Sequence, residues 1–146
     1  AKGAKVLVNE KDLWPDGKFV TTNILVRSEF LAEHPDVVQA VLDAHVQSLE
    51  QIEKDPQASK ADVNAALQSL TGSQLDSKII DSAWKQVEFT ADPLPATLVT
   101  SSQHAVEVGL LDQSEIDAAG GLPGTLYDLT LINKSLANAG LDQVQQ

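Results

Sequence analysis

Residues 19–26, Phe-Val-Thr-Thr-Asn-Ile-Leu-Val, are rich in β-branched residues and favour a β-strand. The run ends in three consecutive apolar residues, which is typical of a strand buried on both faces in the parallel sheet of an α/β protein. A shorter run of the same kind, Lys5-Val-Leu-Val-Asn9, precedes it. Between the two, Trp14-Pro-Asp-Gly17 has the residues of a turn. The first 30 residues therefore predict two strands connected through a turn.

From residue 28 onward the apolar residues repeat with a helical period. A stripe from Val38 to Ile52 predicts an amphipathic helix that begins at Pro35 and stops at Asp55-Pro56. A glycine-rich stretch, Gly120-Gly-Leu-Pro-Gly124, predicts a loop. The other expected helices span about residues 28–34, 60–70, 75–87, 96–108, 114–119 and 126–138.

Two strands alone do not form a stable sheet, and parallel strands need partners reached through crossover connections. No such partner precedes these strands, so residues 1–30 are interpreted as the end of a sheet whose other strands lie outside the chain. Residues 31–146 are then a helical part that packs on that structure. The alternative is a small helical domain with one hairpin. We expect the α/β class, with a mostly helical chain after two N-terminal strands.

The charge of the chain is negative and unevenly distributed. It carries 10 basic and 21 acidic residues, a net charge of −11. Residues 1–30 have a net charge of +1 and residues 31–146 a net charge of −12. This balance argues against a nucleic-acid or anionic membrane surface. The 146 residues include no Met, and we expect them to be part of a longer protein.

The sequence offers few candidates for catalysis. It contains no Cys, which excludes thiol catalysis, disulfides and Cys-ligated metal centres. Its three histidines, His34, His45 and His104, are far apart and lack the spacing of zinc ligands. Ser82-Ala-Trp-Lys85 matches a Ser-x-x-Lys nucleophile motif without its partner motifs. We therefore expect neither an enzyme nor a metal or other cofactor.

The polar residues Thr21, Thr22 and Asn23 interrupt the apolar run. Hydroxyl and amide groups in a buried strand need hydrogen-bond partners or face a cleft. Neutral donors of this kind can hold a small anion. The alternative is that the threonines serve only as strand formers and bond to the backbone.

The stretch from Asp12 to Val38, with Val26-Arg27, Glu29-Phe-Leu31 and His34-Pro35 before an amphipathic helix, carries a family resemblance. It resembles the aliphatic-sulfonate, taurine and nitrate branch of the substrate-binding proteins of ABC transporters. The resemblance extends over most of the chain and is most specific in residues 12–60.

The resemblance implies that the chain is the C-terminal portion of a two-lobed periplasmic-binding-protein fold. Residues 1–30 would end the second-lobe sheet and cross the hinge, and residues 31–146 would pack on the first lobe. It implies a transport function outside the cytoplasm, in the periplasm or as a cell-surface lipoprotein, with an ABC permease as partner. The ligand would be a small anion held by Thr21 and Thr22, with Asn23 and Trp14 nearby. The alternative function is a helical module that self-associates through its uncovered strands and has no ligand.

Overall fold

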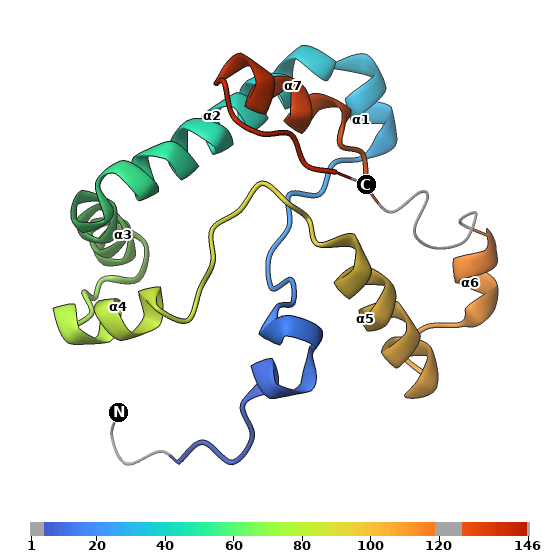
Figure 1. Ribbon diagram of the computed structural model, residues 1–146, viewed down its shortest axis with the longest axis horizontal. Coiled ribbons are helices and arrows are strands. Elements are labelled where there is room, and N and C mark those ends of the chain that lie inside the picture. The colour runs from blue at the N-terminus through green and yellow to red at the C-terminus, as the bar shows by residue number, and fades with distance from the viewer. Residues whose placement is uncertain (1–4, 119–126, 146) are drawn as a thin grey trace. The chain divides into compact units, whose positions relative to one another are not determined.

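The computed structural model describes residues 5–118 and 127–145, and every regular element in these residues is a helix (Figure 1). Within these ranges, two short 3-10 helices come first, followed by seven α-helices. Their bounds are η1 Glu10–Leu13, η2 Pro15–Gly17, α1 Ser28–Glu33, α2 Pro35–Lys54, α3 Pro56–Thr71, α4 Ser77–Trp84, α5 Pro95–Glu107, α6 Gln113–Ala118 and α7 Thr130–Asn138.

The predicted α/β class is wrong, because the described residues contain no strand and no sheet. Residues 5–9 and 19–26, the two expected strands, are not part of any regular element, and Leu7 and Leu25 are 87% and 90% exposed. A two-lobed fold with N-terminal strands is therefore not what this chain forms. The physical reason is that β propensity mainly reflects packing in a sheet, and a strand is formed only where a second strand accepts its backbone hydrogen bonds.

The turn between these segments is present. Trp14 ends η1 and precedes η2, and the backbone N–H of Gly17 donates to the carbonyl of Trp14 at 3.0 Å. Asp16 and Gly17 both have positive φ, 55° and 66°. Glycine accepts this conformation without strain, and aspartate is among the residues that tolerate it best, so the predicted turn chemistry is confirmed.

The described residues form two compact units. The first comprises residues 5–25, 92–118 and 127–129, and the second comprises residues 26–91 and 130–145. The predicted loop at 120–124 and the predicted start of the last helix at residue 126 lie outside the described residues.

The core of the second unit lies where α7 packs on α2. Val46 of α2 is 1% exposed, and Leu136 of α7 is 5% exposed. Val38 and Ile132 are also buried at this junction. The predicted stripe of α2 is only partly covered, since Val41 is half exposed. Burial of a few aliphatic side chains, at roughly 1.5–3 kcal/mol each, is the main hydrophobic contribution here.

The junction of α2 and α3 follows from residues 55 and 56. The Asp55 carboxylate accepts a hydrogen bond from the backbone N–H of Ala58 at 2.9 Å and so caps α3. Pro56 takes the first helical position, where its missing N–H costs nothing. The helix therefore begins at Pro56 and not near Lys60 as the apolar pattern predicts.

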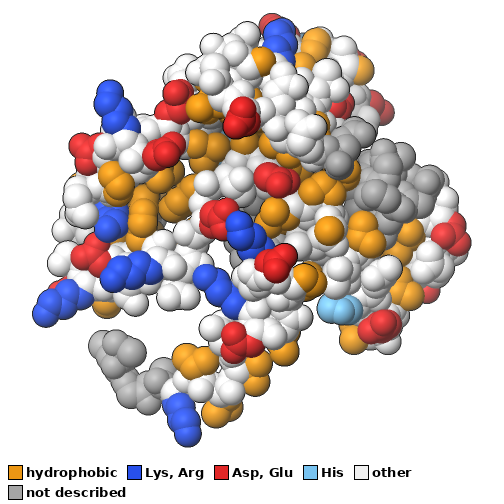
Figure 2. All heavy atoms as spheres, in the orientation of Figure 1, with side chains coloured by type: hydrophobic (Ala, Val, Ile, Leu, Met, Phe, Trp, Pro, Cys, Tyr) orange, Lys and Arg blue, Asp and Glu red, His pale blue; other side chains and the backbone are white. Residues whose placement is uncertain are grey.

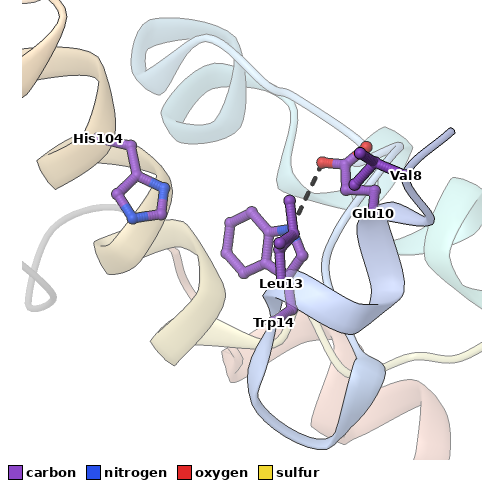
Figure 3. Close-up of a pocket in the computed structure, with 5 residues that line it drawn as sticks. All are labelled: Val8, Glu10, Leu13, Trp14 and His104. Carbon is purple, nitrogen blue, oxygen red and sulfur yellow. Dashed lines mark hydrogen bonds between the residues drawn. The ribbon is translucent and has the colours of Figure 1, made fainter.

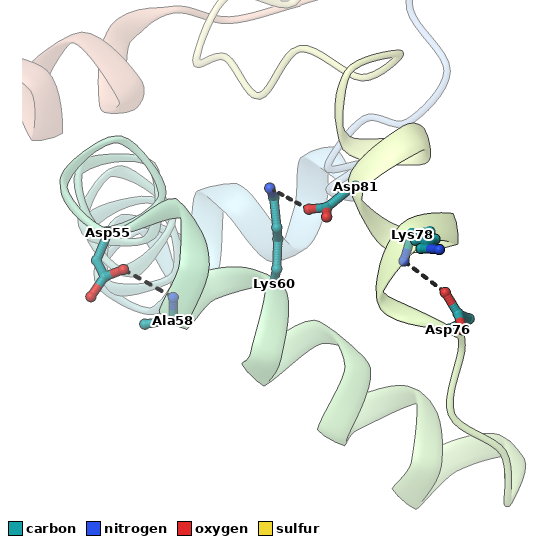
Figure 4. Close-up of polar contacts among 6 residues, drawn as sticks. All are labelled: Asp55, Ala58, Lys60, Asp76, Lys78 and Asp81. Atoms are coloured by element: carbon teal, nitrogen blue, oxygen red, sulfur yellow. Dashed lines mark hydrogen bonds and ion pairs between the residues drawn. The ribbon is translucent and has the colours of Figure 1, made fainter.

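One polar contact fastens α4 to α3 (Figure 4), and another fastens the segment before α4 to α3. The Lys60 ammonium donates to Asp81 at 2.8 Å, and this bond holds the pKa of the Asp81 carboxyl below its ordinary value. Asn64 donates to the carbonyl of Leu75 at 2.9 Å and accepts from its N–H at 2.8 Å. The paired bonds of Asn64 fix the chain just before α4.

Many apolar side chains of the described residues lie at the surface, and Figure 2 shows several of them on one face. Those with at least two thirds of their area exposed include Val6, Leu7, Val8, Leu13, Leu25, Leu70, Val108 and Leu110. None of the described helices is both long enough and apolar enough to cross a membrane. The described residues therefore leave many large apolar side chains uncovered.

Candidate functional site

Trp14 is the centre of the first candidate site. Its position between η1 and η2 leaves the indole half-buried, and the ring stacks on Phe19 with centroids 5.4 Å apart. The indole Nε1 donates a long hydrogen bond of 3.4 Å to Glu10. The imidazole of His104, on α5, lies 5.8 Å from the indole centroid. Local helix geometry positions Glu10, and α5 carries His104.

These residues line a pocket of about 370 Å³, together with Val8 and Leu13 (Figure 3). Its size is at the lower end of the roughly 300–1,000 Å³ that is usual for small-molecule sites, but it is more open than enclosed, with Val8 and Leu13 about two thirds exposed. The lining combines one carboxylate, one indole, one imidazole and two aliphatic side chains. Such a lining can bind a small molecule with an apolar body, but it presents no positive side chain to an anion.

The predicted ligand-binding residues Thr21, Thr22 and Asn23 lie elsewhere in the chain, on the non-helical segment that follows Phe19. All three are exposed, and none of them lines the pocket around Trp14. The structure thus brings Trp14 together with Glu10 and His104 and leaves the other three predicted residues open to solvent. Their hydroxyl and amide groups are available to a ligand or to another chain segment.

A second polar cluster joins α2 to α7. The Gln39 amide donates to Ser135 Oγ at 2.7 Å and to Asp43 at 3.0 Å, and the Ser135 hydroxyl donates to Asp43 at 2.6 Å. The hydrogen bonds to Asp43 hold the pKa of its carboxyl below the ordinary value, and the bond from Ser135 contributes most. Ser135 is buried and bonds to both residues of α2, so the cluster serves to fasten α7 to α2, while the buried Oε1 of Gln39 has no hydrogen-bond partner among the described residues.

The histidines do not converge in the described residues. His34 joins α1 to α2 and contacts the ring of Phe30 at 5.0 Å, while His45 is half-buried on α2. Across residues 5–118 and 127–145, no three His, Asp or Glu side chains are grouped as metal ligands would be.

Sequence reasoning missed Glu10 and His104 as neighbours of Trp14. Glu10 precedes Trp14 by four residues, a spacing that places two side chains close together when the intervening chain is helical. His104 is 90 positions away, and no local pattern indicates its approach. The Gln39, Asp43 and Ser135 cluster was missed for the same reason.

No family model matches the chain, and no curated protein or solved structure is significantly similar to it.

Proposed function

We propose that this chain belongs to the solute-binding component of an ABC importer for a small oxyanion, an aliphatic sulfonate in particular. The proposal rests on the resemblance of residues 12–60 to that family. It implies an extracytoplasmic location, in the periplasm or as a lipoprotein, and an ABC permease as the partner of the whole protein. The proposed role is binding without catalysis.

The observation that carries the proposal is the exposure of polar donors beside apolar side chains in one segment. Thr21, Thr22 and Asn23 offer two hydroxyls and an amide, and Leu25, two residues after Asn23, is 90% exposed. Neutral donors of this kind can hold a small anion, and the exposed leucine near them can contact the alkyl part of a sulfonate. The negative net charge does not prevent anion binding at this segment, because salt screens charges beyond about 8 Å at physiological ionic strength.

Ligand binding is tested by the thermal unfolding of the chain with ethanesulfonate, taurine, nitrate or sulfate, each against sodium chloride of equal ionic strength. A ligand at ten times its Kd stabilises by about 1.4 kcal/mol. For a domain of this size that corresponds to a rise in Tm of about 3–6 °C. We expect this rise with ethanesulfonate. An unchanged Tm with all four anions contradicts anion binding by this chain.

The matched variants are Thr21→Val and Thr22→Val, which remove a hydroxyl and nearly keep the side-chain volume. We expect either change to reduce the ethanesulfonate shift by at least half, because the lost donor leaves the anion without one hydrogen bond. Thr71→Val, at the exposed end of α3, is the control and retains the full shift. If ethanesulfonate raises Tm equally in all three variants, the anion does not bind at Thr21 and Thr22.

The second candidate function is a helical module that self-associates and has no ligand of its own. The exposure of Leu7 and Leu25, at 87% and 90%, favours it, because uncovered apolar segments promote pairing between chains. We expect light scattering to show a dimer that forms as the protein concentration rises, and Leu25→Asp to weaken it. Leu70→Asp, at a comparably exposed leucine of α3, is the control. A monomer at every concentration contradicts this function.

A further inference from the structure

The pocket around Trp14 has a lining that differs from that of an anion site. Its one formally charged side chain is the carboxylate of Glu10, and its largest surface is the indole of Trp14. Figure 3 shows the indole ring between His104 on one side and Glu10 with Val8 on the other. A carboxylate and an aromatic ring in one pocket attract the same kind of ligand, a cation, by charge and by the ring quadrupole.

The geometry defines which parts of the indole a ligand can reach. One face of Trp14 is stacked on Phe19 with an interplanar angle of 18°, so a ligand reaches the opposite face or the ring edge. The hydrogen bond from Nε1 to Glu10 holds the carboxylate beside the ring. The charge and the aromatic surface therefore act on a ligand at the same point.

The aliphatic lining adds a second requirement. Val8 and Leu13 are about two thirds exposed, and they present methyl groups to the pocket. A ligand that covers them gains hydrophobic stabilisation, which a small, strongly hydrated metal ion or ammonium ion cannot provide. An alkylated ammonium group carries both the positive charge and the apolar surface.

We propose that the pocket formed by Val8, Glu10, Leu13, Trp14 and His104 binds a small quaternary ammonium ligand, with its charge against Glu10 and Trp14 and its methyl groups against Val8 and Leu13. The site shares only Trp14 with the residues predicted to hold the anion, and the other three lie outside it.

The test is a titration with choline followed by the indole N–H signals in a ¹H–¹⁵N spectrum. The chain contains two tryptophans, Trp14 and Trp84, so two such signals are expected, and Trp14→Phe assigns them. We expect the Trp14 signal to shift with saturation at millimolar choline, and the Trp84 signal to stay in place. Failure of the Trp14 signal to move, or an equal movement of both signals, overturns the proposal.

Two controls separate charge from apolar contact. The neutral isostere 3,3-dimethylbutan-1-ol has the shape of choline without its charge, and we expect it to bind at least fivefold more weakly. Glu10→Gln keeps an oxygen that accepts from the indole and removes only the charge, and we expect it to weaken choline binding at least threefold. Glu33→Gln, an exposed change in α1, leaves the affinity unchanged. Equal binding of the isostere, or unaltered affinity in Glu10→Gln, shows that no cation site exists here.

Discussion

Leu136→Ala is expected to destabilise the chain by about 2–3 kcal/mol, the lower part of the range for leucine-to-alanine changes in protein cores. Leu136 lies in α7 and is 5% exposed, because α7 packs against α2. The substitution removes buried methyl groups and leaves a cavity in a core with few other members. Urea unfolding followed by the helical circular dichroism signal measures the change.

The matched control is Leu70→Ala, which makes the same chemical change at a leucine of α3 that is 84% exposed. It removes almost no buried area, so we expect the free energy of unfolding to change by less than about 0.5 kcal/mol. If both variants unfold at the same urea concentration, α7 does not pack on α2 in solution.

Ser135→Ala is expected to have the second largest effect, a destabilisation of about 1–2 kcal/mol. The buried hydroxyl of Ser135 both accepts from Gln39 and donates to Asp43, so its loss breaks two hydrogen bonds between α2 and α7. Ser48→Ala is the control, because Ser48 is exposed on α2 and bonds only to the carbonyl of Ala44 one turn earlier. We expect little change in Ser48→Ala.

The effect of Ser135→Ala depends on pH in a defined direction. The pKa of Asp43 lies below its ordinary value of 3.8 in the folded chain, chiefly because Ser135 donates to it. A lowered folded pKa stabilises the fold above the unfolded value, and this stabilisation is lost as the pH falls through the folded pKa. The difference in unfolding free energy between Ser135→Ala and the parent chain is therefore largest at neutral pH and shrinks below about pH 4. A difference that grows on acidification contradicts this role of Ser135.

The helices could be predicted because their start and stop signals are local. Pro35 and Asp55-Pro56 bound α2 in the sequence and in the structure, and the apolar pattern placed α5 within a residue of its observed start at Pro95. The start of α3 was wrong by four residues, because Pro56 and the Asp55 cap begin the helix before its apolar stripe does.

The strands were wrong because strand formation depends on a partner and not only on the residues of the strand. Residues 19–26 have high β propensity, yet the described part of the chain offers them no second strand. Contacts between residues far apart in the sequence could not be predicted from local patterns either. His104 approaches Trp14, and Ser135 approaches Asp43, through packing that sequence periodicity does not encode.

The segment at residues 19–26, which has high β propensity and contains the exposed Leu25, also bears on the colloidal behaviour of the chain. Lys18 and Arg27 stand at its two ends, which is where natural sequences place charged gatekeepers beside segments prone to form amyloid-like stacks. If copies of this segment stacked in register, the Lys18 side chains of successive copies would lie close together, as would the Arg27 side chains, and would repel one another. The net charge of −11 adds long-range repulsion between whole chains. High salt screens both effects, so concentrated stocks of this protein remain dispersed best at low ionic strength and neutral pH.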